Sequence, residues 1–193
     1  MIASNAAVQS AFRVDDSLQG WNISAKEWLM KHHKANDIDG LATAIAVFDT
    51  RGRLLIVQRA AHDSMPNRWE LPGGAVDDDD PTILHGAARE LFEEAGLLAQ
   101  SFTHVIPAGP QVAPGNVFTN STKTKRWCQF AFHATVEGLR VQLDPNEHQA
   151  FFWAMEDEIR AQQSAEQDLP ITKEAVLAIM IEAFRLRRTG MKA

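Results

Sequence analysis

The sequence lacks several features that mark common classes of protein. Its 193 residues include a single cysteine, Cys128, so no disulfide can form within the chain. No apolar run approaches the roughly 20 residues that cross a membrane. Met1 to Val14 lacks the basic start and apolar core of a secretory signal. We therefore expect a cytoplasmic protein in a reducing compartment, without membrane contact.

Positive charge is also scarce in this chain. Its 19 lysine and arginine residues are outnumbered by 25 aspartate and glutamate residues, which gives a net charge of −6 at pH 7. Such a chain is unsuited to broad binding of phosphate backbones, so we expect no stable nucleic-acid partner. Its length and its 45% hydrophobic content predict one globular domain with extensions. We divide it into an N-terminal extension with a short helix, 1–40, and a main domain, 41–193, that includes a C-terminal helix.

Strand and helix patterns are mixed along the main domain. Strands are predicted at 41–48, 53–58, 102–106, 125–136 and 150–154. The turn Asp49–Gly52 predicts that the first two form a hairpin. Residues 107–124, rich in Pro, Gly, Asn and Thr, predict a loop, and 171–188 predicts a long amphipathic helix. The mixture predicts an α/β fold, an α/β/α sandwich around a mixed β-sheet.

The most informative stretch begins at two glycines and ends at Leu97. It contains the acidic run Asp77–Asp80 and then a predicted helix, which starts near Pro81 with Asp79 or Asp80 as its cap and stops at Gly96. One helix face is apolar, with Leu84, Ala88, Leu91 and Ala95. Three glutamates, Glu90, Glu93 and Glu94, lie roughly opposite, since residues three and four apart are neighbours.

Three clustered carboxylates repel each other unless a cation lies among them. Mg²⁺ prefers oxygen ligands of this kind, and a carboxylate-bound Mg²⁺ is a common device for chemistry on phosphates. The stretch therefore predicts a metal-dependent enzyme with a phosphorylated substrate. The alternative is an acidic helix face that is only solvated.

This stretch resembles the Nudix box, G-x5-E-x7-R-E-U-x-E-E-x-G-U, where U is a bulky apolar residue. Arg89 to Leu97 matches the second half of the motif in full, within a box that spans Gly74–Leu97. The first half differs in two ways. Fourteen residues separate Gly74 from Arg89, one more than in the motif, and an aspartate from Asp77–Asp80 stands in place of the first glutamate.

The resemblance implies the Nudix fold and a hydrolase dependent on Mg²⁺, or on Mn²⁺. The implied substrate is a small molecule with a diphosphate linkage, a nucleoside diphosphate derivative such as ADP-ribose, a dinucleotide or a modified nucleoside triphosphate. Two alternatives stay open: an isoprenoid diphosphate hydrolase, and a Nudix module that binds a ligand without cleaving it. Because many relatives are dimers, a homodimer is also open.

By resemblance, Glu90, Glu93 and Glu94 are the metal ligands, and Glu90 and Glu94 are also catalytic. Arg89 joins the catalytic set as the residue that orients a carboxylate. Gly73 and Gly74 are predicted to bind substrate, since backbone without a Cβ can approach a phosphate closely.

Outside the box, Glu147 is the best candidate for a further ligand or general base, against a surface acid. His148 beside it is more readily explained as structural. Arg59 is a candidate for a phosphate contact, or for a salt bridge at the rim. Trp127 is a candidate for stacking on a substrate group, or for core packing.

Overall fold

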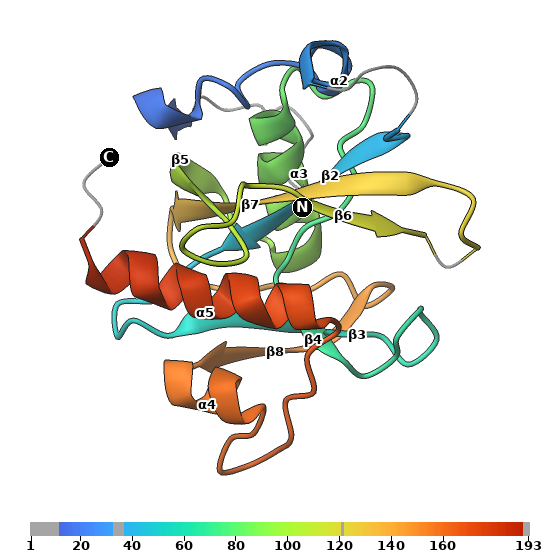
Figure 1. Ribbon diagram of the computed structural model, residues 1–193. Helices are drawn as coiled ribbons and strands as arrows, with labels where there is room; N and C mark the ends of the chain where they lie inside the picture. Colours follow the sequence, from blue (N-terminus) through green and yellow to red (C-terminus); the bar gives the residue numbers. More distant parts are fainter. Residues whose placement is uncertain (1–11, 33–36, 121, 191–193) are drawn as a thin grey trace.

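The computed structural model describes residues 12–32, 37–120 and 122–190 (Figure 1). A five-stranded mixed sheet has the order β1-β5-β7-β2, with β6 also paired to β7. Its strands are β1 (Arg13–Val14), β2 (Gly40–Ala46), β5 (Ala99–Ile106), β6 (Asn116–Thr119) and β7 (Arg126–Val136). A three-stranded antiparallel sheet has the order β4-β3-β8, formed by β3 (Leu54–Arg59), β4 (Trp69–Glu70) and β8 (His148–Ala154).

Helices cover both sides of these sheets. They are η1 (Asp16–Leu18), α2 (Ala25–His32), α3 (Ile83–Ala95), α4 (Glu156–Ala161) and α5 (Glu174–Arg188). Alternate residues of β2 point to opposite sides, so that Leu41 and Ile45 pack with α3, and Ala44 and Ala46 pack with α5. In Figure 1, α5 crosses in front of the sheets and α3 lies behind β7. The predicted α/β fold is confirmed.

The predicted hairpin is correct only at its tip. The bridge between Phe48 and Leu54 joins the two segments, and the strands then separate into different sheets. β2 pairs in parallel with β7 from Gly40 to Ala46, whereas β3 pairs with β4 and β8. β2 is buried almost throughout, as expected for a strand covered on both faces.

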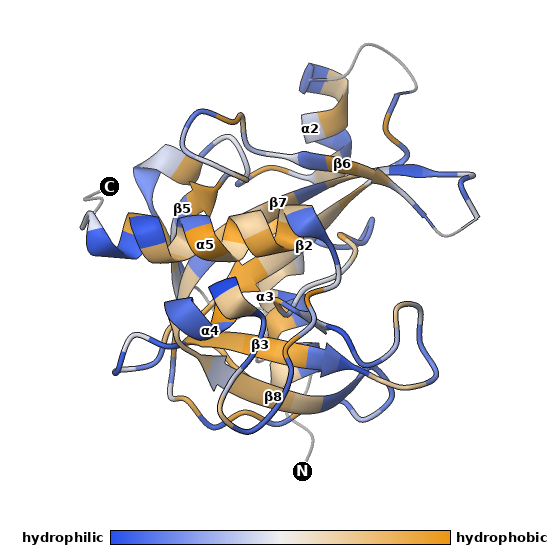
Figure 2. Ribbon diagram, turned by 60° about the horizontal axis from the view of Figure 1, so that its bottom comes forward, coloured by the Kyte–Doolittle hydropathy of each residue, from blue (hydrophilic) through white to orange (hydrophobic). Residues whose placement is uncertain are grey.

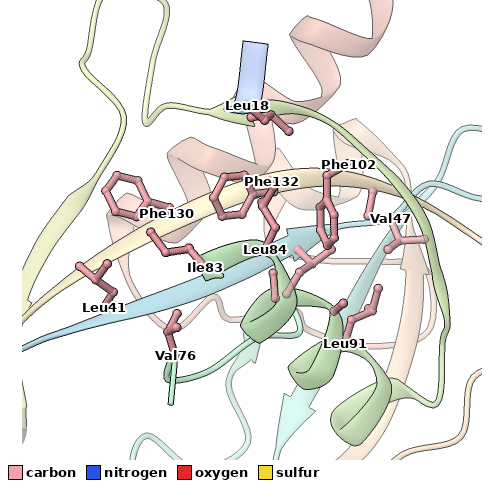
Figure 3. Packing of buried hydrophobic residues seen from close by; sticks show 14 of the residues in the cluster. Leu18, Leu41, Val47, Val76, Ile83, Leu84, Leu91, Phe102, Phe130 and Phe132 are labelled. Atoms are coloured by element: carbon pink, nitrogen blue, oxygen red, sulfur yellow. The ribbon is translucent and has the colours of Figure 1, made fainter. Parts of the chain in front are cut away.

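The N-terminal segment joins the core on the α3 side. β1 pairs in parallel with β5, and Leu18 and Trp28 are buried beside Phe102, Phe130 and Phe132. Figure 3 shows Leu18 above Phe132 and Leu84 of α3 below it. The short helix predicted in the N-terminal extension is present as α2, and the Ser24 hydroxyl accepts the Glu27 N–H at 3.2 Å. The boundary at residue 40 stays a prediction.

On the other side, α5 covers β2 and β3. Its buried residues include Ile179, Met180 and Ala183, which join one cluster with Leu54 and Ile56 of β3. Figure 2 shows hydrophobic residues along α5 and on the strands beside it. None of the helices in the described ranges is long and apolar enough to cross a membrane.

The prediction of a loop over 107–124 is wrong at its centre. Residues Asn116–Thr119 form β6, which pairs with the edge of β7 from Asn116↔Gln129 to Thr119↔Arg126. The turn residues around β6 predict the loop correctly. They contain no signal for the strand, since its four residues gain their order from the partner strand.

Candidate metal and substrate site

Helix α3 has an apolar face and an acidic face. The predicted stop at Gly96 is confirmed, with Gly96 in the left-handed conformation at φ +67°. The predicted start is wrong: Thr82 caps the helix by accepting the His85 N–H, so α3 begins at Ile83. Asp80 does not cap the helix, because its carboxylate accepts the Asp77 N–H and pairs with Arg89.

Arg89 links the acidic loop to the helix. Its Nε and Nη2 donate to the two carboxylate oxygens of Asp80 at 3.1 and 3.0 Å. Its Nη1 donates to Glu90 at 2.9 Å and to Glu93 at 2.8 Å. Burial opposes the charge of Arg89, but the Asp80 hydrogen bonds and the Glu90 charge outweigh it and raise the Arg89 pKa. Of the four aspartates, Asp80 therefore occupies the place that suits the missing glutamate.

The glycine turn, Gly73–Gly74, packs directly against two of the glutamates. The Gly73 N–H donates to Glu94 Oε2 at 2.6 Å. Gly73 has φ +142°, and a Cβ there would lie 2.4 Å from the Thr43 carbonyl oxygen. A Cβ on Gly74 would lie 2.6 Å from Glu90 Oε2. Gly73 therefore requires glycine, whereas a side chain at Gly74 would displace the Glu90 carboxylate.

Glu94, Glu147 and His148 converge behind this turn. Each offers one ligand atom, and these atoms all lie within 4.8 Å of one another. Glu94 is 6% exposed and His148 is 2% exposed, whereas Glu147 is exposed. The structure thus brings Glu147 beside Glu94 as the prediction requires. Glu93 points elsewhere, toward Arg89, with an exposed side chain. We call Glu90, Glu94, Glu147 and His148 the acidic cluster.

The carboxylates of this cluster disfavour each other's charge. Burial raises the pKa of Glu90 to about 7, and the charges of Glu93 and Glu147 add to the rise against the opposing effect of Arg89. Burial also raises the pKa of Glu94, with smaller contributions from Glu90, Glu70 and Glu147. A divalent cation would favour the charged forms. The donor set therefore fits the divalent metal that the family resemblance implies.

A cavity of about 530 Å³ opens beside the glycine turn. All four predicted substrate residues line it: Arg59, Gly73, Gly74 and Trp127. The Arg59 guanidinium is paired with Glu70 and Asp63, so much of its charge is balanced. Trp127 closes one wall, and its ring lies against Gly40, where a Cβ would be 2.7 Å away.

Sequence reasoning missed further residues of this cavity. Phe118, Gln129 and Lys173 line it, and Lys173 Nζ lies 4.2 Å above the centre of the Phe118 ring. Burial lowers the Lys173 pKa. Phe118 lies inside the predicted loop and Lys173 just before α5, so neither had a signal. Glu70 was also missed; its place three residues before Gly73 was the available signal.

Known proteins resemble this chain in sequence and fold. The family model of the NUDIX domain matches residues 39–175. CTP pyrophosphohydrolase of Escherichia coli (strain K12) is 28% identical over 134 residues, which cover 69% of this chain and 89% of that protein. RNA pyrophosphohydrolase of Rhizobium meliloti (strain 1021) is 29% identical over 113 residues, covering 54% and 66% of the two chains.

Among solved structures, the MutT protein from Methanosarcina mazei Go1 has the same fold. It superposes with a TM-score of 0.58 at 23% identity, covering 82% of this chain and 100% of that one. The family match includes the glycine turn, all of α3 and the Glu147–His148 segment. The chain belongs to the NUDIX domain family and is a hydrolase that acts on diphosphate bonds.

Proposed function

We propose that this protein is a divalent-metal-dependent hydrolase of a nucleoside diphosphate derivative. The observation that supports this most is the position of the glycine turn. Gly73 bonds to Glu94 of the acidic cluster, and the same two glycines line the cavity. A nucleoside in the cavity therefore has its phosphates beside the cluster. Mg²⁺ or Mn²⁺ bound there supplies positive charge that offsets the phosphate oxygens.

The acidic residues then have separate roles. Glu94 and Glu147 hold the cation, and Glu93 is a further ligand by resemblance to the Nudix box. Glu90, whose pKa is raised to about 7, is suited to accept a proton from the attacking water. Arg89 is a positioning residue, because it donates to the carboxylates of Glu90 and Glu93.

The cavity favours a nucleoside over an isoprenoid chain. Its volume is that of a small-molecule site. Aromatic rings of Phe118 and Trp127 offer stacking surfaces, while Gln129, Asn120 and Lys173 offer polar groups that an isoprenoid would leave unpaired. The names of the relatives, CTP pyrophosphohydrolase and RNA pyrophosphohydrolase, agree with a nucleotide. A ligand-binding module without activity would have no use for three box glutamates.

A substrate panel tests this proposal. Purified full-length protein with Mg²⁺ or Mn²⁺ is given nucleoside triphosphates, ADP-ribose, a dinucleotide, an isoprenoid diphosphate and an RNA with a 5′ triphosphate, and product release is measured. We expect turnover of at least one small nucleotide. Exclusive turnover of the isoprenoid or of the RNA would overturn the nucleotide assignment, and tight retention without turnover would support the binding module.

The panel is repeated with Glu94→Gln, which keeps the size of the side chain and tests whether turnover depends on the metal site. Loss of a metal ligand removes several kcal/mol of transition-state stabilisation, so we expect turnover to fall roughly a thousandfold. Glu174→Gln, an exposed change at the start of α5, should leave the rate unchanged. Near-normal activity of Glu94→Gln would exclude Glu94 as a ligand.

Two further points stay predictions. A cytoplasmic location is expected from the single cysteine of the sequence. A homodimer is expected only because many members of the family are dimers. Size-exclusion chromatography with light scattering would measure the oligomeric state.

A further inference from the structure

His148 is the most deeply buried residue of the acidic cluster. It is the first residue of β8, is 2% exposed, and has both ring nitrogens buried. Within the described part of the chain, neither nitrogen has a hydrogen-bond partner. The closest charged group is Glu70, whose Oε1 lies 3.7 Å from Nε2, too far for a hydrogen bond.

A buried imidazole without a partner is costly. An unsatisfied buried polar group destabilises the fold, and native proteins leave few of them. Glu70 does not remove this cost, because its Oε1 lies 3.7 Å from Nε2 and is drawn toward Arg59, with which it pairs. The carboxylates of Glu94 and Glu147 also lie within reach of His148.

The spacing of these three residues suits a shared cation. Two ligands of one small cation, each about 2.1 Å from it, lie at most about 4.2 Å apart. The three ligand atoms are all within 4.8 Å of one another. Small movements of the side chains therefore suffice, and Glu147 is exposed and free to adjust.

We propose that His148 is a nitrogen ligand of the catalytic metal, together with Glu94 and Glu147, and that it makes the site prefer Mn²⁺ to Mg²⁺. Imidazole suits transition metals, whereas Mg²⁺ prefers an all-oxygen shell. A bound cation also gives one buried nitrogen the partner that it lacks. This inference rests on the proposed metal-dependent function and specifies the chemistry of its metal site.

Pulsed electron paramagnetic resonance of Mn²⁺ in the full-length protein tests the ligand directly. We expect a ¹⁴N coupling typical of a bound imidazole, which changes to a ¹⁵N coupling when the protein is made with ¹⁵N-histidine. This measurement needs no substitution, so it does not depend on whether a variant folds. A Mn²⁺ centre without nitrogen coupling would overturn the proposal, whether or not the protein turns over a diphosphate.

Calorimetric titration with Mn²⁺ and with Mg²⁺ tests the preference. We expect Mn²⁺ to bind at least about tenfold more tightly. Loss of a residue that only supports a metal ligand commonly changes the affinity by about 10–100-fold, and a direct ligand should matter at least as much. In His148→Gln this ratio should fall toward one and the nitrogen coupling should vanish. The control His32→Gln, on the exposed side of α2, should change neither. Equal affinities in the unaltered protein would reject the preference.

Failure of the inference is distinguishable from failure of the proposed function. Turnover of a nucleotide by a protein whose Mn²⁺ centre lacks nitrogen would leave the function intact and reject His148 as a ligand. A Mn²⁺ centre with histidine nitrogen but no turnover on any diphosphate would support the ligand and reject the function.

Discussion

The two sides of the glycine turn are built in different ways. On one side, Asp80, Arg89, Glu90 and Glu94 come from fifteen consecutive residues. Arg89 donates hydrogen bonds to Asp80 and Glu90, and Glu94 accepts one from the Gly73 N–H. On the other side, the cavity collects residues from β2, β3, β6, β7 and the start of α5. Most of the reacting groups therefore come from one local motif, which the fold completes with Glu147 and His148. Substrate selection depends entirely on segments brought together by the fold. We call the first group of residues the motif side and the second group the cavity side. A change on the motif side should alter the rate, and a change on the cavity side should alter the choice of substrate.

Among the changes that compare the two sides, the largest expected effect after that of Glu94→Gln comes from Gly74→Ala. The new Cβ would lie 2.6 Å from Glu90 Oε2, the mobile end of a side chain, so the fold should survive while the carboxylate is displaced. We expect turnover to fall about a hundredfold, the lower range for loss of a general base. Gly20→Ala, with nothing within 4 Å of its Cβ, is the control. Unchanged turnover in Gly74→Ala would contradict a catalytic role for Glu90.

Asp80→Asn should have the next largest effect. It removes the buried charge that pairs most closely with Arg89 from the acidic loop and leaves the exposed Asp77, 3.4 Å away. A hydrogen bond to a charged group contributes about 1.5–3 kcal/mol, so we expect the free energy of unfolding to fall by about 2 kcal/mol. We expect the rate to fall about tenfold, as is common when a residue that supports a metal ligand is lost. Denaturant titration and steady-state kinetics measure both. The exposed neighbour Asp78→Asn should change neither quantity; an equal effect there would contradict a specific role for Asp80.

Trp127→Ala tests the cavity side. Base stacking on an aromatic residue contributes about 1–3 kcal/mol, so we expect KM for the best nucleotide to rise about tenfold with little change in kcat. The comparison variant is Trp21→Phe, in the core on the opposite side of the sheet, for which KM should not change. A fall in kcat alone for Trp127→Ala would place its ring with the reacting groups instead.

The smallest expected effect is a pair of opposite pH dependences of stability. Burial raises the Glu90 pKa to about 7, so the folded state keeps a proton that the unfolded state has lost above about 4.5. Without metal, this contribution to stability falls as the pH rises from about 4.5 to about 7. Burial lowers the His133 pKa to about 4. Below about pH 6.5 this histidine gains a proton in the unfolded state but not yet in the folded state. The contribution of His133 to the free energy of unfolding therefore falls as the pH drops from about 6.5 to about 4.

Thermal unfolding between pH 4 and 8 separates the two. Glu90→Gln should flatten the loss on the neutral side, and His133→Gln should flatten the loss on the acid side. Saturating Mn²⁺ should abolish the first dependence and leave the second, because only the acidic cluster binds the cation. A single slope that responds to neither substitution would contradict both assignments.

The sequence predicted the motif side closely because its contacts are local. The apolar face of α3, its end at Gly96 and the proximity of the glutamates follow from helical periodicity within about four turns. It did not predict that Thr82 rather than Asp80 caps the helix. Both residues have side chains suited to a cap, and only the fold shows that Arg89 has engaged Asp80.

The cavity side was predicted only in part for the same physical reason. Trp127 and Arg59 were found as aromatic and basic residues near strand ends. Phe118 was hidden in a loop-like segment, since β6 is ordered by pairing with β7 rather than by its own four residues. The pattern also could not divide the strands into two sheets, because strand partners far apart in the chain are set by packing.

The sequence by itself therefore determined the family, the bond to be cleaved and the helix with its carboxylates, since these depend on residue types at fixed local spacing. Only the tertiary structure decided that Asp80 pairs more closely with Arg89 than Asp77 does, that Glu147 and His148 reach Glu94, and that the cavity opens beside the glycine turn. Asp80 and Arg89 are nine positions apart across a loop of irregular conformation, and the other contacts join residues tens of positions apart. Burial and the packing of the strands, rather than local spacing, decide which of these residues meet.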